Sequence, residues 1–432
     1  MSSKQKKEKK EPSTAPRGMR DIMNEAYYDF QGFFEKAQEV AIYYGFKPIE
    51  TPILEHEDVF TTTIGEGTDI VDKEMYTLHT KGGDHLALRP EHTAGTMRAY
   101  IEHGMQNQPQ PVMFYHSGPV FRHDNPQAGR YRQFTQFDID ALGSDKSVID
   151  ALVIKATMTI LEEAGAENLT VDINSIGDKE SRTVYIRELT NYYKKHLSAL
   201  PAVDRERLKT NPLRILDSKD PKTIEINENA PDAISHLSAP CKKHFKEVLE
   251  YLEELGIPYQ INKCLVRGLS YYTHTVFEII QQNATESGGS LTIAGGGRYD
   301  YLARQLGAKK EIPAVGASIG VDRVIIQPWF KKLAPRNVKK PKVYFIQLGM
   351  EAKLKSLNVI EILRKAKVPI YQSLSKDTLS TQLAIAEKMQ IPYTIIFGQK
   401  EALENSVIVR DMSTRSQKTV EIKKLSEYLK KL

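Results

Sequence analysis

Cysteine, tryptophan and long apolar runs are scarce in this chain. Its 432 residues include two cysteines and one tryptophan. Cys241 and Cys264 give no disulfide framework and no metal-ligand spacing, which predicts a reducing, cytoplasmic compartment and no protein-bound metal. No apolar run approaches the ~18 residues that a membrane-spanning helix needs. Because the first residues also lack the apolar segment of a signal peptide, we expect no membrane partner.

The two sequence patterns that most often bind nucleotide phosphates are also missing. The chain has no GxxxxGK[ST] loop, and no GxGxxG follows a predicted strand. Phosphate binding would therefore depend on arginines, whose guanidinium groups bind phosphates bidentately and keep their charge. Arg122, Arg267 and Arg323 are the candidates, each in a separate motif. Any one of them alone is more typical of a surface ion pair, so the hypothesis requires that the three converge.

Charge is unevenly distributed along the chain. The whole sequence has a net charge of +5, with 40% hydrophobic and 27% charged residues, which is typical of a globular protein of two or three domains. Residues 341–432 hold 16 Lys and Arg against 9 Asp and Glu, a net charge of +7, so the remainder sums to −2. This imbalance suggests a polyanionic partner for the C-terminal part, although ordinary surface lysines would give the same count.

Breaks in the pattern divide the chain into segments. Residues 1–17 carry six Lys or Arg and two Glu, and we predict a disordered basic tail there. Residues 331–341, rich in lysine and proline, are the best linker candidate. Strands and helices alternate through 342–432 and predict a small α/β domain. Between about 172 and 260 the pattern is mostly helical.

The segment of residues 121–140, FRHDNPQAGRYRQFTQFDID, is the most informative part of the sequence. Residues 124–129 supply turn formers between two extended stretches, which predicts a hairpin. Alternation along the second strand places six side chains on one face: Arg130, Arg132, Phe134, Gln136, Asp138 and Asp140. A solvated strand face is the ordinary explanation, since buried charges are costly unless paired. The alternative is a ligand with phosphates at one end and an amine or ring N–H at the other.

Several segments, taken together, resemble the histidyl-tRNA synthetase family of class II aminoacyl-tRNA synthetases. The hairpin resembles the second signature motif of that class, GASIGVDR at 316–323 resembles the third, and residues 45–60 resemble the first. Three further segments are similar to those of the histidine-specific family: LRPEHTAGTMRAY at 88–100, LVRGLSYYTHTVFE at 265–278 and AGGGRYDYLARQLG at 294–307. The resemblance extends from about Gly18 to the C-terminus.

This resemblance implies an α+β catalytic domain at residues 18–330 and a C-terminal α/β anticodon-binding domain at 342–432. An antiparallel six-stranded sheet flanked by helices would hold the active site, with a helical insertion at about 172–260. The segment NPLRILDSKD at 211–220 fits that insertion. The first class II motif implies a homodimer.

The resemblance also implies an activity in two steps. L-histidine and ATP, which brings Mg²⁺ with it, give histidyl adenylate and pyrophosphate, and the histidyl group then passes to tRNA(His). By position in the motifs, Arg122 holds the α-phosphate and Arg267 supports the transition state from the other side. Arg323 meets the terminal phosphates, and Arg130 joins the ATP-binding set.

A second set of residues is assigned by the resemblance to the amino-acid end of the site. Glu91 and Gln136 are expected to receive the substrate ammonium. The imidazole is expected to meet a carboxylate and two phenols, Asp140, Tyr271 and Tyr272. Such a site rejects other amino acids because a mismatched ligand leaves its buried polar groups unpaired. The histidine-binding set is completed by His92, Thr93, Arg122 and Arg267, with packing as the alternative role of His92.

Four residues in these motifs either have two alternative roles or differ from the family pattern. Gln127, in the hairpin turn, is a candidate contact for the acceptor end of the tRNA or an exposed turn residue. Asp124 and Asp322 are shorter than the acids that the family usually has there, and Ser270 replaces a common aspartate. These differences could loosen the ATP contacts or the orientation of Tyr271 without removing a principal ligand.

Two other functions compete with the leading one. A non-catalytic paralogue, like the regulatory subunit of ATP phosphoribosyltransferase in histidine biosynthesis, would be expected to lack the arginine motif around Arg267 and the C-terminal domain. A class II synthetase for proline or threonine would not need Asp140 or the pair formed by Tyr271 and Tyr272. This sequence has all of these features.

Removal of residues 341–432 should weaken tRNA binding and reduce its dependence on salt, because fewer phosphates would be neutralised. The measurement is tRNA affinity at several salt concentrations, for the full and the truncated chain. Retained histidine activation by the truncated chain would serve as the folding control. Unchanged tRNA affinity would show that the +7 charge of this segment is incidental.

Overall fold

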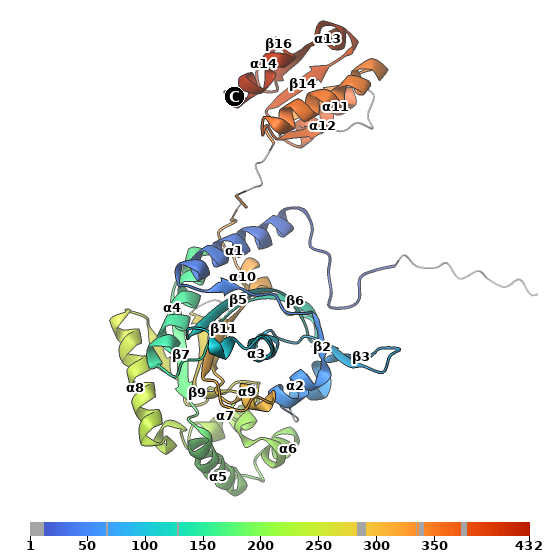
Figure 1. Cartoon of the computed structure of the whole chain (residues 1–432). Coiled ribbons are helices and arrows are strands. Elements are labelled where there is room, and N and C mark those ends of the chain that lie inside the picture. The colour runs from blue at the N-terminus through green and yellow to red at the C-terminus, as the bar shows by residue number, and fades with distance from the viewer. Residues whose placement is uncertain are drawn as a thin grey trace, which may run out of the picture. The chain divides into compact units, whose positions relative to one another are not determined.

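The computed structural model describes residues 13–65, 68–127, 129–282, 291–333, 335–336, 341–372 and 378–432. Two compact units are present, Met1–Pro335 and Arg336–Leu432 (Figure 1). Most of the predicted basic tail, residues 1–12, lies outside the described residues, as do residues 334 and 337–340 of the predicted linker. The two units are therefore considered separately.

The first unit is built on an eight-stranded mixed sheet with the order β1-β5-β6-β11-β10-β9-β7-β8. Its strands are β1 Lys47–Pro48, β5 Val112–Phe121, β6 Gln133–Leu142, β7 Leu169–Ser175, β8 Tyr259–Ile261, β9 Thr273–Gln281, β10 Leu291–Arg298 and β11 Ala314–Gly320. The six inner strands, β5 to β7 in this order, are antiparallel to one another. The prediction of six strands was therefore wrong, because β1 and β8 extend the sheet in parallel at its two edges. Strands of two and three residues are too short to produce an alternating pattern in the sequence.

One face of this sheet carries the main hydrophobic core. The helices α1 Asn24–Tyr43, α4 Ser147–Glu163 and α8 Ala239–Glu254 contribute to it. From β6, Phe137, Ile139 and Ala141 point into the same core. The intervening side chains of β6 must then lie on the opposite face, because side chains alternate along a strand.

The opposite face packs against a second apolar cluster, which includes residues of α3 Thr93–Glu102 and α9 Leu302–Gln305. In Figure 1 the sheet curves around α3. Beside it lie α2 Glu57–Ile64, the π-helix η1 Ile70–Glu74 and the 3-10 helix η2 Met105–Asn107. The short helix α10 Val321–Ile325 packs instead in the main core, through Val321 and Val324. A small sheet of β2 Leu54–His56, β4 His85–Leu88 and β3 Tyr76–His79 completes this side. Residues 45–60, which resemble the first class II motif, thus turn into helix at Glu57.

The predicted helical insertion at 172–260 is not confirmed as one body. Its first residues belong to β7, and its last helix, α8, packs in the main core through Phe245, Val248 and Leu252. Between them, a separate hydrophobic cluster joins the intervening helices. These helices are α5 Lys179–Lys195, α6 Ala202–Thr210, η3 Pro212–Ile215, α7 Pro221–Asn227 and η4 Ile234–His236.

The second unit is an α/β domain with a five-stranded sheet in the order β13-β12-β14-β15-β16. Its strands are β12 Val343–Gln347, β13 Ile370–Gln372, β14 Tyr393–Phe397, β15 Ser406–Asp411 and β16 Gln417–Glu421, and its helices are α11 Met350–Lys365, α12 Leu379–Lys388, α13 Gln399–Glu404 and α14 Ile422–Lys430. Apolar clusters form on both sides of this sheet. The sequence pattern did not indicate β16, which is mostly exposed and has a single buried residue, Val420. Among the described residues, no helix is both long and apolar enough to cross a membrane.

Candidate active site

An open pocket of about 540 Å³ lies on the face of the large sheet that α3 covers. Nine of the predicted site residues line it: Glu91, Thr93, Arg122, Arg130, Gln136, Arg267, Tyr271, Tyr272 and Arg323. They come from segments more than 200 residues apart in the sequence. The convergence that the arginine hypothesis required is therefore present.

The floor of the pocket is formed by the inner strands of the sheet. On β6, Phe134, Gln136 and Asp138 line the pocket, and Asp138 pairs with Ser318 on β11. Ser318 pairs in turn with Gly295 on β10. The alternation predicted for the hairpin is thus correct from Phe134 onward, whereas Arg130 and Arg132 precede the first residue of the strand.

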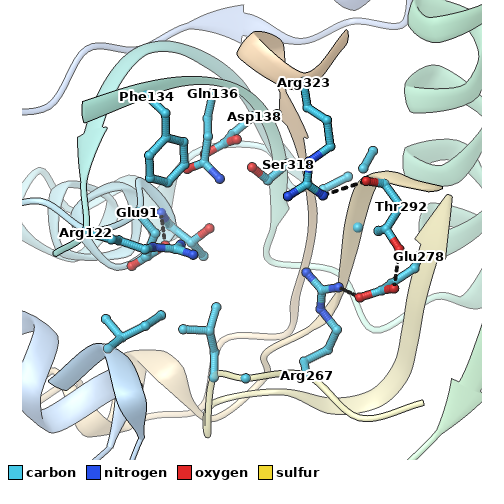
Figure 2. A pocket seen from close by; sticks show the side chains of 18 of the residues that line it. Glu91, Arg122, Phe134, Gln136, Asp138, Arg267, Glu278, Thr292, Ser318 and Arg323 are labelled. Carbon is cyan, nitrogen blue, oxygen red and sulfur yellow. Dashed lines mark hydrogen bonds and ion pairs between the residues drawn. The ribbon is translucent and has the colours of Figure 1, made fainter. Parts of the chain in front are cut away.

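Three guanidinium groups point into this pocket from three sides (Figure 2). Arg122 donates through Nε to the carbonyl oxygen of Pro90 at 2.9 Å, with the ring of Phe134 beneath its guanidinium at 5.5 Å. Arg323 donates to the carbonyl oxygen of Thr292 at 2.6 Å. Each arginine is held by a contact that leaves further N–H donors for a ligand, since a guanidinium has five. An anion in the pocket would therefore be contacted from several directions.

Arg267 forms an ion pair with an acidic residue and lies over a glycine, which has no side chain to displace it. It pairs with Glu278 on β9, and Glu278 accepts a second hydrogen bond from the Thr292 hydroxyl at 3.0 Å (Figure 2). Below its guanidinium lies Gly295, where a Cβ would come within 2.6 Å of an Arg267 nitrogen. Only glycine leaves room for the arginine to lie flat on the sheet at this position.

The other end of the pocket contains a carboxylate and a cluster of tyrosines. Asp140 is 2% exposed and accepts a hydrogen bond from the hydroxyl of Tyr299, a residue that the sequence did not single out. The Tyr271 ring lies 4.8 Å from that of Tyr272 and 5.8 Å from that of Tyr299. Burial raises the pKa of Asp140 well above its ordinary value, against the hydrogen bond from Tyr299, and the charges of Asp138 and Glu91 add to the rise.

Asp140 thus binds the hydroxyl of Tyr299, and not that of Tyr271 or Tyr272, the two tyrosines that the resemblance placed with it. Tyr272 lies instead near Arg267, whose guanidinium carbon is 5.7 Å from its ring centre. The signal for Tyr299 was present in the motif AGGGRYDYLARQLG. What the sequence could not indicate is that the pairing of β10 with β9 shifts register between Gly297 and Arg298, directly before this tyrosine.

Glu91 has a structural task in addition to the one predicted for it. Its two carboxylate oxygens accept hydrogen bonds from the backbone N–H groups of Thr93 at 2.6 Å and Ala94 at 2.9 Å. It thereby satisfies two of the orphan donors at the start of α3. Burial raises the pKa of Glu91, and the two backbone donors oppose that rise.

Three predicted residues lie outside the pocket lining. Gln127 is exposed and makes backbone hydrogen bonds with Arg130 in the turn. Asp140 lies beneath the lining and reaches the pocket through Tyr299. His92 is fully buried behind Asp138, so its alternative role in packing describes its position better than direct substrate contact.

The three residues that differ from the family pattern all have local partners. Asp124 pairs with Arg130. Asp322, in the first turn of α10, accepts hydrogen bonds from Arg20 and from the Thr135 backbone N–H, both at 2.6 Å, and so connects α10 and β6 to the N-terminal segment. The carbonyl oxygen of Ser270 accepts a hydrogen bond at 3.0 Å from Arg182 on α5.

A buried network of two histidines supports the centre of the floor. His92 donates through Nδ1 to Asp138 at 2.7 Å, and its ring stacks on that of His116 at 3.9 Å. Arg89 lies 3.3 Å from Nε2 of His116 and also binds the carbonyl oxygens of Thr51 and Pro119. Because arginine can only donate, Nε2 of His116 must be the acceptor. The His116 ring is therefore neutral, with its proton on Nδ1.

Comparison with known proteins agrees with this geometry. Residues 18–324 match the family model described as histidyl-tRNA synthetase, and residues 342–432 match the model of the anticodon binding domain. A histidine–tRNA ligase of Desulforamulus reducens is 38% identical over 97% of this chain and 99% of its own length. The chain belongs to the histidyl-tRNA synthetase family. Within that family, a relative from Natranaerobius thermophilus is 37% identical, with 97% of this chain and 99% of the relative covered.

Solved structures of histidyl-tRNA synthetases share the fold. The apo enzyme of S. aureus is 30% identical, with a TM-score of 0.77 over 97% of this chain and all of that one. A Bacillus halodurans protein, described as an ATP phosphoribosyltransferase regulatory subunit/histidyl-tRNA synthetase, has a TM-score of 0.63 at 22% identity. It covers 90% of this chain and 99% of its own, and at this identity it shows the fold alone.

The neutral His116 predicts how the stability of this protein depends on pH. Burial, and next the positive environment of His92 and Arg89, lowers the pKa of His116 to about 2. In the unfolded chain the ring takes up a proton near pH 6.5, so between these values the unfolded state binds one more proton. The free energy of unfolding should therefore fall with decreasing pH by up to about 1.4 kcal/mol per unit from this group.

His116→Asn should reduce that slope by about 1.4 kcal/mol per pH unit between about pH 4.5 and 6. The measurement is urea unfolding at a series of pH values. His103→Asn is the matched control, because His103 is exposed and should leave the slope unchanged. An unaltered slope in His116→Asn would contradict the buried, neutral state of that ring.

Proposed function

We propose that this protein ligates L-histidine to tRNA(His), using ATP and forming a histidyl adenylate. The observation that carries the proposal is one pocket with three arginines around an open space and a carboxylate with three tyrosines at the far end. The first end suits a phosphate chain, and the second suits a ring with N–H groups. Membership of the histidyl-tRNA synthetase family supports the same reaction.

In this proposal the arginines bind and activate ATP. Arg122 and Arg267 flank the α-phosphate, and their charges stabilise the crowded phosphorus centre when the histidine carboxylate attacks. Arg323, with Arg130 near the pocket entrance, holds the terminal phosphates. Because Glu278 fixes Arg267 before any ligand arrives, little reorganisation is needed during the reaction.

The amino-acid end of the pocket would select histidine. Glu91 and Gln136 receive the ammonium, with Thr93 beside them. Asp140 with Tyr299, and the pair Tyr271 and Tyr272, would surround the imidazole. Buried oxygens that are left without partners exclude ligands lacking ring N–H groups.

Mg²⁺ would enter the site with ATP. Among the described residues, no group of three or more His, Cys, Asp and Glu side chains could hold a metal ion. Mg²⁺ commonly binds nucleotide phosphates together with one or two carboxylates, and Glu278 lies in the pocket lining. Such binding needs no site made of protein groups alone.

The organisation of the chain follows from the same proposal. Residues 18–330 would be the catalytic domain, 331–341 a linker and 342–432 the anticodon-binding domain. We assign the insertion to the helical cluster around α5, α6 and α7. Gln127, in the hairpin turn, would contact the acceptor end of the tRNA. The residues predicted to form the first class II motif would mediate a homodimer, and the enzyme would act in the cytoplasm.

A regulatory subunit without catalysis is the second candidate, suggested by the description of the B. halodurans protein. The geometry favours catalysis. Arg267 is oriented by Glu278 and lies directly over the sheet, which a purely regulatory histidine sensor would not require.

Histidine should be required for exchange of pyrophosphate into ATP by the purified protein. Proline, threonine and glycine should not support exchange, because they leave Asp140 and the tyrosines without partners. The measurement is ATP–pyrophosphate exchange with each amino acid in turn. A well-folded protein without histidine-dependent exchange would overturn the proposed function.

Arg267→Ala should reduce the rate of adenylate formation by at least about 100-fold, since a charge directed at the reacting phosphate is lost. Histidine binding should remain measurable by calorimetry. Arg304→Ala removes an exposed arginine outside the pocket lining and should behave like the unaltered enzyme. Normal exchange by Arg267→Ala would refute the role given to this residue.

A further inference from the structure

Asp138 has no role in the scheme above, although it lies in the lining of the pocket. It is 2% exposed, and among the described residues its Oδ1 atom has no hydrogen-bond partner. A buried carboxylate oxygen without a partner is costly. The cost is removed if a ligand supplies the missing donor.

The position of Asp138 on the sheet places it between two proposed ligand contacts. Gln136, Asp138 and Asp140 follow one another on the same face of β6, at intervals of about 7 Å. Gln136 is proposed to meet the ammonium of histidine and Asp140 its imidazole. A histidine that spans the two must pass over Asp138. Figure 2 shows Asp138 beside Gln136 and Ser318.

Gln136, like Asp138, has a buried oxygen, its Oε1 atom, without a hydrogen-bond partner among the described residues. The ammonium-binding residue Glu91 already uses both oxygens to accept backbone N–H groups of α3. An ammonium group has three N–H donors to place. Gln136 and Asp138 therefore each offer this end of the pocket an acceptor without a partner among the described residues, as does the hydroxyl of Ser318 on the neighbouring strand.

Three groups behind Asp138 fix the orientation of its carboxylate. His92 holds the Oδ2 atom at 2.7 Å. The ring of His92 is held by stacking on His116, which Arg89 anchors to the backbone of the neighbouring segments. With Oδ2 occupied, Oδ1 is the atom left for the pocket. Burial lowers the pKa of the Arg89 guanidinium, and the nearby charge of Asp138 opposes that change.

We propose that Asp138 is a substrate-binding residue whose Oδ1 atom accepts a hydrogen bond from the α-ammonium of histidine, and that His92 is its positioning residue. This proposal rests on the proposed function, because it takes L-histidine as the ligand. The ammonium would then meet the negative charge of Asp138 and the amide oxygen of Gln136, which lie two residues apart on the same face of β6. Glu91 then supplies the second charge at the helix end.

Asp138→Asn tests the proposal, since it keeps the shape of the side chain and removes its charge. The Michaelis constant for histidine in pyrophosphate exchange should rise roughly 10- to 100-fold, as expected for loss of a hydrogen bond to a charged group. The Michaelis constant for ATP should stay within about twofold. Asp145→Asn, the same change at an exposed position outside the lining, should alter neither value.

Binding of two histidine analogues identifies the substrate group that Asp138 contacts. Histidinol keeps the ammonium, and imidazolepropionate lacks it. Asp138→Asn should weaken histidinol binding and leave imidazolepropionate binding unchanged. Equal loss for both analogues, or loss for neither, would overturn the proposal. If the unaltered protein binds neither L-histidine nor histidinol, the proposed function itself fails. If the unaltered protein binds them and Asp138→Asn weakens neither analogue, only the role of Asp138 fails.

The positioning role of His92 has its own test. His92→Asn retains a donor near the place of Nδ1, whereas His92→Ala does not. The Michaelis constant for histidine should rise in His92→Ala and be largely restored in His92→Asn, with kcat changing less than this constant. Equal effects of the two substitutions would refute the role. If Asp138→Asn does not fold, the comparison of His92→Ala with His92→Asn still tests the role of Asp138.

Discussion

The burial of charge against one face of a β-sheet is the constraint on which this site depends. Arg89, Arg122, Arg267, Asp138 and Asp140 all contact the pocket or lie just behind it. Charged groups removed from water are tolerated only where each finds a compensating partner. Each of these groups has at least one partner within the protein, and further donors or acceptors, such as those of Arg122 and Asp138, remain for a ligand.

This division of partners explains why the pocket can be rigid without a ligand. Glu278 holds Arg267, Tyr299 holds Asp140, and His92 holds Asp138. Each functional group is therefore oriented by a second group that does not itself need to touch the substrate. Such preorganisation lowers the cost of binding and of reaching the transition state.

Much of this arrangement could be predicted from the sequence, because it depends on local patterns. The alternation on β6 correctly separated Gln136, Asp138 and Asp140 from the core residues Phe137 and Ile139. The separate motifs of the three arginines also identified residues that the fold brings into one pocket.

Other features depend on contacts that no local pattern contains. The resemblance implied a sheet of six strands, and the two edge strands are too short to show an alternating pattern in the sequence. Tyr299 contacts Asp140 across 159 residues of sequence, directly after a register shift between β9 and β10. The stack of His92 on His116 likewise joins a helix start to a distant strand. Such pairs are set by tertiary packing alone.

The two glycines of the pocket floor limit how this site could evolve. A methyl group at Gly316 would lie 2.2 Å from an oxygen of Asp140, and one at Gly295 would lie 2.6 Å from a nitrogen of Arg267. Substitution of either glycine would therefore displace one end of the site or the other before it creates a new preference. Altered substrate choice would have to arise at the remaining floor positions or from the side walls.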